Sequence, residues 1–175
     1  NRAYGIIAGY RRTFFSPTLS AHLATILSRS IGSEGIIGGQ IVDLASQGKK
    51  VDLETLEFIH SRKTGALFSA AAEMGASFGR ARDIDRLAVL TFAKNLGLAF
   101  QISDDILDAT SDSSHIGKDT GKDQDKTTFI TFCGLDGSRK LAEELIQTAV
   151  QALGPLKSRA DLLRSFADFV LRRTK

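Results

Sequence analysis

Apolar side chains recur at intervals of three and four residues along most of this chain. That spacing puts them on one face of a helix, and no stretch shows the strict alternation of a half-buried strand. The pattern therefore predicts an all-α fold. Helices are expected over residues 1–10, 19–45, from 52 through at least 68, 83–108, 137–153 and 159–173.

Two features of this pattern bear on packing. Glycines at positions 32, 35, 38 and 39 lie inside the predicted helix 19–45. Each costs about 1 kcal/mol of helix propensity relative to alanine, so we expect a close helix–helix approach to offset them. Breaks are predicted at Ser16-Pro17, where proline suits a first helical position, and in a turn at 47–50.

The segment from Leu87 to Leu107 is apolar on nearly every side, which is typical of a helix in the centre of a domain. Residues 109–125 are polar, have no period and predict a long functional loop. We expect one domain over residues 1–175, a helical bundle around a buried central helix.

Composition narrows the choice of function. The 175 residues are 42% hydrophobic and 25% charged, and the net charge of +3 is too small to indicate nucleic-acid binding. No apolar run reaches the roughly 18 residues of a membrane span, and no signal peptide is visible. Cys133 is the single cysteine, which excludes an internal disulfide and predicts a reducing compartment such as the cytoplasm.

Basic residues gather near both ends of the chain, at Arg11 and Arg12 and at Arg172, Arg173 and Lys175. We interpret them as solvated helix ends, where cations suit the helix C-terminus. A role facing phosphate stays open for the C-terminal group.

Asp104, Asp105 and Asp108 form a DDxxD pattern at the end of the apolar helix. Asp104 and Asp108 share a helix face, while Asp105 lies about 100° further round. Carboxylates so close to an apolar core resist ionisation unless a cation compensates them. Mg²⁺ is commonly held by one or two carboxylates together with substrate phosphates. We therefore predict a metal site, against the alternative of a solvated helix end.

Two further segments carry candidate phosphate-binding groups. The loop 117–126 alternates glycine with charge and contains Lys118 and Lys126. Flexible glycine loops let a backbone approach phosphate, and lysines act on it as mobile charges. The second segment, 60–65, presents Lys63 and Thr64 beside a glycine. Each segment taken alone is more typical of a protein surface, and we interpret His60 as structural.

The motifs occur in one order along the chain. They are Gly38-Gly39-Gln40 with Asp43-Leu44, Phe58-Ile59-His60 with Lys63-Thr64-Gly65, Phe100-Gln101 with Asp104 to Asp108, Gly117-Lys118, and Lys126-Thr127-Thr128. With these motifs, nearly the whole chain from Gly32 onward resembles the trans-isoprenyl diphosphate synthases, the family of farnesyl and geranylgeranyl diphosphate synthases. The resemblance implies an all-α fold of the class I terpenoid synthase type.

The resemblance also implies roles for these residues. Asp104, Asp105 and Asp108 would be the second aspartate-rich motif of a site with three Mg²⁺ ions, with Asp104 the foremost ligand. The lysines at 63, 118 and 126 would hold the allylic diphosphate, and Thr64 and Gln101 would lie near the allylic cation. Such an enzyme joins an allylic diphosphate to isopentenyl diphosphate and works as a homodimer.

Two departures from the family pattern matter. The short loop 123–126 is similar to that of geranylgeranyl diphosphate synthases in bacterial carotenoid pathways, which favours that product over the farnesyl one. The first aspartate-rich motif and the upstream basic residues that hold isopentenyl diphosphate are absent from this sequence. Since the chain also begins at Asn1, we expect it to be the C-terminal half of the enzyme, with the N-terminal half missing, and inactive by itself.

Two alternatives of other kinds stay open. A non-catalytic partner subunit could keep the fold with half the site, although a structural role gives no reason to keep facing carboxylates. A class I terpene cyclase would need the metals but not isopentenyl diphosphate, and the Lys63-Thr64 and Gly117-Lys118 motifs favour a chain-elongating enzyme over it.

In the complete enzyme, Asp104→Ala is expected to lower turnover by orders of magnitude, because the leaving diphosphate loses metal compensation. The helical circular-dichroism spectrum should stay that of the wild type. Steady-state kinetics of both proteins check this, and wild-type turnover in the variant would contradict the metal assignment.

Overall fold

The computed structural model describes residues 2–9, 16–111 and 127–173, and within these ranges every regular element is helical. The predicted all-α fold is confirmed. A short 3-10 helix at Gly154–Ala160 precedes the last α-helix. The α-helices are α1 (Arg2–Gly9), α2 (Pro17–Ile31), α3 (Ile36–Ala45), α4 (Leu53–Lys63), α5 (Gly65–Phe78), α6 (Asp83–Ser111), α7 (Phe129–Ala152) and α8 (Asp161–Arg172).

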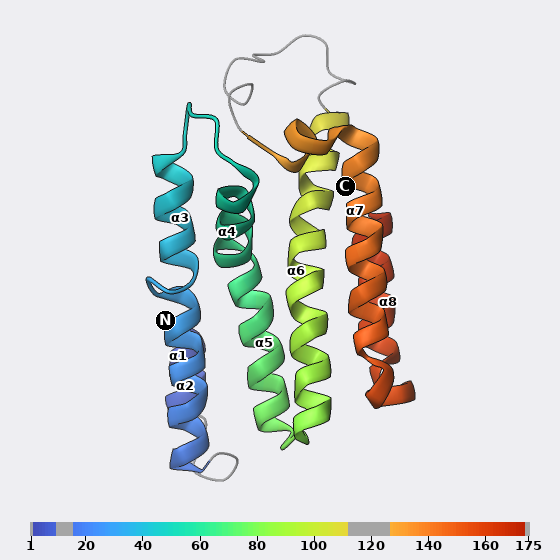
Figure 1. Cartoon of the computed structure of the whole chain (residues 1–175). Helices are drawn as coiled ribbons and strands as arrows, with labels where there is room; N and C mark the ends of the chain where they lie inside the picture. Colours follow the sequence, from blue (N-terminus) through green and yellow to red (C-terminus); the bar gives the residue numbers. More distant parts are fainter. Residues whose placement is uncertain (1, 10–15, 112–126, 174–175) are drawn as a thin grey trace.

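Helix α6 is the centre of the bundle, as the apolar segment predicted. It runs the length of the molecule between α5 and the pair α7 and α8, and it also contacts α4 (Figure 1). It ends at Ser111, so residues 109–111 of the predicted loop are helical. The lower end of α6 departs from the prediction, because Ile84 and Leu87 are more than half exposed there.

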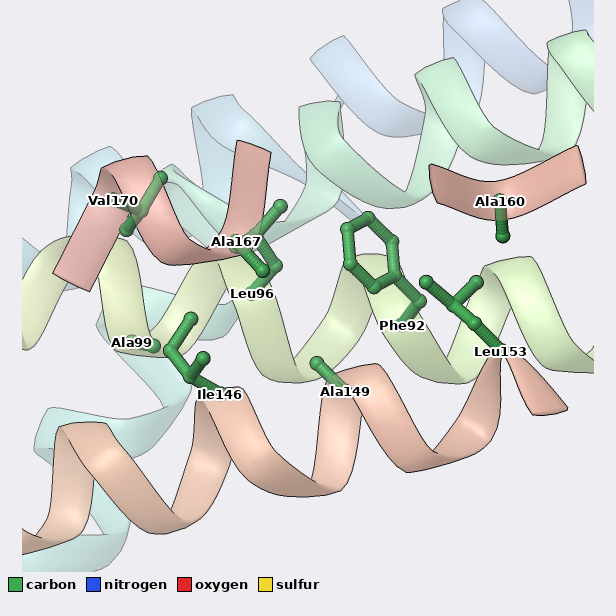
Figure 2. Packing of buried hydrophobic residues seen from close by; sticks show 9 residues of the cluster. All are labelled: Phe92, Leu96, Ala99, Ile146, Ala149, Leu153, Ala160, Ala167 and Val170. Carbon is green, nitrogen blue, oxygen red and sulfur yellow. The ribbon is translucent and has the colours of Figure 1, made fainter. Parts of the chain in front are cut away.

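The main core lies where α6 meets α7 and α8 (Figure 2). Small side chains at the contact let the three backbones come close, while Phe92 and Leu96 fill the space between them. The core residues are Phe92, Leu96, Ala99, Ile146, Ala149, Leu153, Ala160, Ala167 and Val170.

The prediction of one helix over 19–45 was wrong. α2 ends at Ile31 and α3 begins at Ile36, with Gly32 extended between them at φ −79° and ψ −163°. A Cβ at Gly35 would lie 1.9 Å from the carbonyl oxygen of Ser30, so this tight turn requires glycine. Gly32 and Gly38 are likewise crowded by backbone of the preceding turn rather than by another helix.

The predicted close approach of two helices is found at Gly39, the fourth glycine of that group. A Cβ at Gly39 would lie 2.5 Å from the backbone nitrogen of Lys63 and 2.8 Å from Cβ of Arg62. Helix α3 therefore crosses α4 with backbone almost against backbone at this point.

The helix predicted from Asp52 begins as expected, since the Asp52 carboxylate accepts a hydrogen bond of 2.8 Å from the backbone N–H of Thr55. It is bent at Thr64, where α4 gives way to α5. Helix α7 begins at Phe129, before the predicted Gly137, because Gly134 at φ 69° lets the chain kink there and continue.

Among the helices within the described ranges, none combines the length and the apolar character needed to cross a membrane.

Gly39→Ala is expected to lower the free energy of unfolding by about 1–3 kcal/mol, because the added methyl forces α3 away from α4. Gly75→Ala in α5 is the matched control, since its Cβ would meet nothing within 4 Å. That change should leave stability equal or raise it by about 0.5–1 kcal/mol through helix propensity. Urea denaturation of both variants measures the difference, and equal stabilities would contradict the crossing.

Candidate functional site

Helices α5 and α6 cross at a pair of glycines. A Cβ at Gly97 would lie 3.1 Å from Cα of Gly65 and 3.4 Å from Cβ of Phe68. Gln101 stands one turn beyond Gly97 on the same face of α6. The crossing therefore brings Gln101 to the junction of α4 and α5, where Thr64 lies.

A chain of hydrogen bonds joins three of the predicted site residues. The Thr64 hydroxyl donates to Oε1 of Gln101 at 2.9 Å, and Nε2 of Gln101 donates to Oδ1 of Asp105 at 3.4 Å. Asp105 is buried. Since both ends of the Gln101 amide have partners, its orientation is determined, and residues distant in sequence meet in one place.

Lys63 is held by a residue that sequence reasoning did not assign to the site. Its Nζ donates to Oδ2 of Asp43 at 2.6 Å, and both side chains are partly buried. Asp43 stands one turn after Gly39, so the close crossing of α3 and α4 delivers it to Lys63. The four-residue spacing of Gly39 and Asp43 could have indicated that Asp43 lies beside a close helix contact. The sequence does not reveal which helix Gly39 contacts, so the partner Lys63 could not be assigned.

Asp104 is engaged by the C-terminal end of the described chain. Nη2 of Arg173 donates to Oδ1 of Asp104 and, at 2.8 Å, to the backbone oxygen of Phe100. The guanidinium carbon lies 3.9 Å from the centroid of the Phe100 ring. The interpretation of the C-terminal arginines as solvated was therefore wrong for Arg173, whose side chain is only 11% exposed.

The neighbouring Arg172 fits that interpretation. Its side chain is 78% exposed and makes an i,i+4 ion pair with Asp168. Positions 11, 12 and 175 of the predicted basic groups lie outside the described residues.

The electrostatics of Asp104 agree with a shared face for the acidic pair. Partial burial is the largest influence and raises the pKa of Asp104, the Arg173 guanidinium lowers it, and the negative charge of Asp108 raises it again. The pKa ends above its ordinary value. The negative charge of Asp108 thus acts on Asp104, which fits the shared helix face expected from their spacing.

The carboxylates predicted to bind metal are not gathered into one ligand set among the described residues. In the part of the chain that the structure describes, no group of three or more acidic, histidine or cysteine side chains is gathered around one point. Asp105 turns to Gln101, while Asp104 faces Arg173. The oxygen donors suit Mg²⁺, which needs only one or two carboxylates when phosphates complete its shell.

Three residues singled out from the sequence remain, of which His60 is buried and the two lysines lie outside the described ranges. His60 is buried and its ring stacks on Phe129 at a centroid distance of 5.5 Å, which fits the structural role expected for it. Lys118 and Lys126 lie outside the described residues.

Known proteins are similar to this chain in sequence and in fold. Residues 2–161 match the family model described as polyprenyl synthetase. The chain is 43% identical over 150 residues to a geranylgeranyl diphosphate synthase of Cyanophora paradoxa, covering 84% of this chain and 50% of that protein. The chain spans about half the length of the curated relatives it matches. The share is 41% for a geranylgeranyl pyrophosphate synthase of Capsicum annuum and 52% for a farnesyl diphosphate synthase of Escherichia coli.

Two solved structures are similar. One is an FPP/GFPP synthase from Zymomonas mobilis, with a TM-score of 0.82 and 34% identity over 97% of this chain and 56% of that one. The other is a geranyltransferase from Helicobacter pylori complexed with magnesium and isoprenyl diphosphate. Its TM-score is 0.76 at 29% identity, over 97% of this chain and 55% of that one.

Thr64→Val is expected to lower the free energy of unfolding by about 1 kcal/mol, because Gln101 loses a hydrogen-bond donor at nearly unchanged volume. Thr148→Val is the control, since the Thr148 hydroxyl donates only to Glu144 of its own helix. Chemical denaturation measures both, and an equal effect of the two changes would contradict a tertiary hydrogen bond at Thr64.

Proposed function

Because this chain belongs to the polyprenyl synthetase family, we propose that it carries part of the active site of a Mg²⁺-dependent trans-prenyltransferase. The resemblance drawn from the sequence is confirmed at the level of the family. The proposed reaction joins an allylic diphosphate to isopentenyl diphosphate and gives a short-chain product of the geranylgeranyl or farnesyl class. The names of the Cyanophora and Zymomonas relatives support that class.

The observation that carries the proposal is the contact of Thr64 with Gln101 and of Gln101 with Asp105. It joins the Lys63-Thr64 motif of the α4–α5 junction to the acidic motif of α6. In the proposed reaction the oxygens of Thr64 and Gln101 face the allylic carbon as positive charge develops there. The hydrogen bond between them holds the Gln101 oxygen in place before the substrate arrives.

The acidic motif is the proposed metal-binding part of the site. Asp104 and Asp108 would supply carboxylate oxygens from one face of α6, and Asp105 would join them or orient Gln101. Mg²⁺ ions held there, of which we propose three in the complete site, would neutralise the charge of the leaving diphosphate. The magnesium and isoprenyl diphosphate in the Helicobacter relative support this.

The basic groups of the site would hold the diphosphate. Lys63 is positioned by Asp43, which keeps its ammonium at the α3–α4 crossing and partly exposed. The assignment of Lys118 and Lys126 to the same diphosphate rests on the sequence motifs. The apolar stretch of α6 that ends at Asp108 would supply part of a wall that excludes water from the allylic cation.

Assembly and compartment complete the proposal. Ile37, Ile41 and Leu44 form an exposed apolar row along one face of α3, which supports a homodimer. The lone Cys133 supports a reducing compartment, and we propose the cytoplasm.

A second candidate is a non-catalytic partner subunit. The paired carboxylates Asp104 and Asp108 argue against it, because a purely structural role gives no reason to keep them.

The test is a chimera that joins this chain to the part of the Cyanophora paradoxa synthase that it does not match. The chimera is incubated with Mg²⁺ and an allylic diphosphate, with and without isopentenyl diphosphate, and the products are analysed by mass spectrometry. We expect an elongated diphosphate only when both substrates and Mg²⁺ are present, and almost none from the chain by itself. Asp104→Ala in the chimera is the matched control.

Two other results of the product analysis would contradict the proposed reaction. Cyclic products without isopentenyl diphosphate would indicate a terpene cyclase. A folded chimera without any product would favour the partner-subunit role.

A further inference from the structure

Arg173 is held more firmly than a surface arginine. Its guanidinium contacts α6 through the backbone oxygen of Phe100, the face of the Phe100 ring and the carboxylate of Asp104. The Arg173 side chain is 11% exposed and that of Asp104 is 36% exposed, so the pair is partly shielded from the solvent screening that weakens exposed ion pairs.

The same contacts place the positive charge of Arg173 beside Asp104, where the proposed function also places a metal ion. Asp104 and Asp108 lie close enough on α6 to repel each other. Asp108 also lies in the last turn of α6, and that end of the helix carries partial negative charge. Arg173 compensates these negative charges when no other cation is bound.

We propose that Arg173 is a positioning residue that holds Asp104 in the metal-free protein and that a divalent cation displaces it from there. The inference rests on the proposed function, in that it takes Asp104 as a metal ligand. Oδ1 of Asp104 cannot serve a guanidinium and a divalent ion at bonding distance without strong repulsion between the two cations.

The local backbone permits such a displacement. Val170 is fully buried in the core and anchors the last turn of α8. Arg173 comes after the last helical residue, with an extended backbone at φ −60° and ψ 137°. Its side chain can therefore leave Asp104 without undoing the packing of α8.

The test measures Mn²⁺ binding to the chain by isothermal titration calorimetry at about pH 8, with no diphosphate present. Arg173→Met removes the charge and keeps an unbranched apolar side chain over Phe100. Because the competing cation is gone, we expect the Kd for Mn²⁺ to fall roughly tenfold. Arg172→Met is the matched control, since it makes the same charge change one residue away on an exposed side chain, and it should change Kd less than about twofold.

The outcomes separate the inference from the function on which it rests. If Asp104→Asn weakens Mn²⁺ binding while Arg173→Met leaves it unchanged or weaker, the displacement is overturned and the metal role of Asp104 stands. If neither the wild type nor Arg173→Met binds Mn²⁺, both proposals fall.

A conservative variant keeps the test decisive should Arg173→Met fail to fold, as judged by circular dichroism. Arg173→Lys keeps the charge but loses the planar fork that reaches Phe100 and Asp104 together. We expect its Kd to lie between those of the wild type and a tenfold tighter complex, roughly threefold below the wild type. A Kd equal to that of the wild type would overturn the inference.

Discussion

The backbones of α5 and α6 meet where Gly65 faces Gly97, and the site depends on that contact. A side chain at Gly97 would push the two helices apart and draw Gln101 away from Thr64. Gly39 plays the same part between α3 and α4, and there the residue one turn further on is Asp43, which reaches Lys63. In both places a glycine lets two helices approach closely, and the polar side chain one turn later can therefore reach a hydrogen-bond partner on the other helix. The cost of these glycines in helix propensity is offset by the contacts they permit.

Helix α6 combines an apolar middle that is buried in the core with an acidic C-terminal end, and burial disfavours charge. Its middle is buried against α7 and α8 by Phe92, Leu96 and Ala99. Its last turns carry Asp104, Asp105 and Asp108, and partial burial disfavours the charge of Asp104. The structure relieves this with partners from elsewhere in the chain, since Gln101 donates to Asp105 and Arg173 to Asp104. A polar cluster that an apolar core would not by itself tolerate is typical of a functional site.

The end of α8 connects the core to the site. Ala167 and Val170 fix the helix in the same cluster that buries the middle of α6. That packing brings Arg173 to Asp104, 69 positions earlier in the chain. A neighbour in sequence, Arg172, points outward and pairs within its own helix. Two adjacent arginines thus have different roles because α8 ends at Arg172, while Arg173 has an extended backbone and its side chain contacts α6.

Sequence alone determined what depends on neighbours within a few turns of helix. The all-α fold, the central position of α6, the cap at Asp52 and the shared face of Asp104 and Asp108 follow from period, capping and spacing, which are local properties. The break between α2 and α3 was missed, because the glycines that fit a helix–helix contact fit a tight turn equally well. The contacts of Asp43 with Lys63 and of Arg173 with Asp104 could be assigned only from the tertiary structure. The family resemblance had placed Thr64 and Gln101 near the same cation, but the hydrogen bond between them was also found only there. Each pair joins separate helices, and which helices touch is decided by the burial of the whole chain rather than by any segment of it.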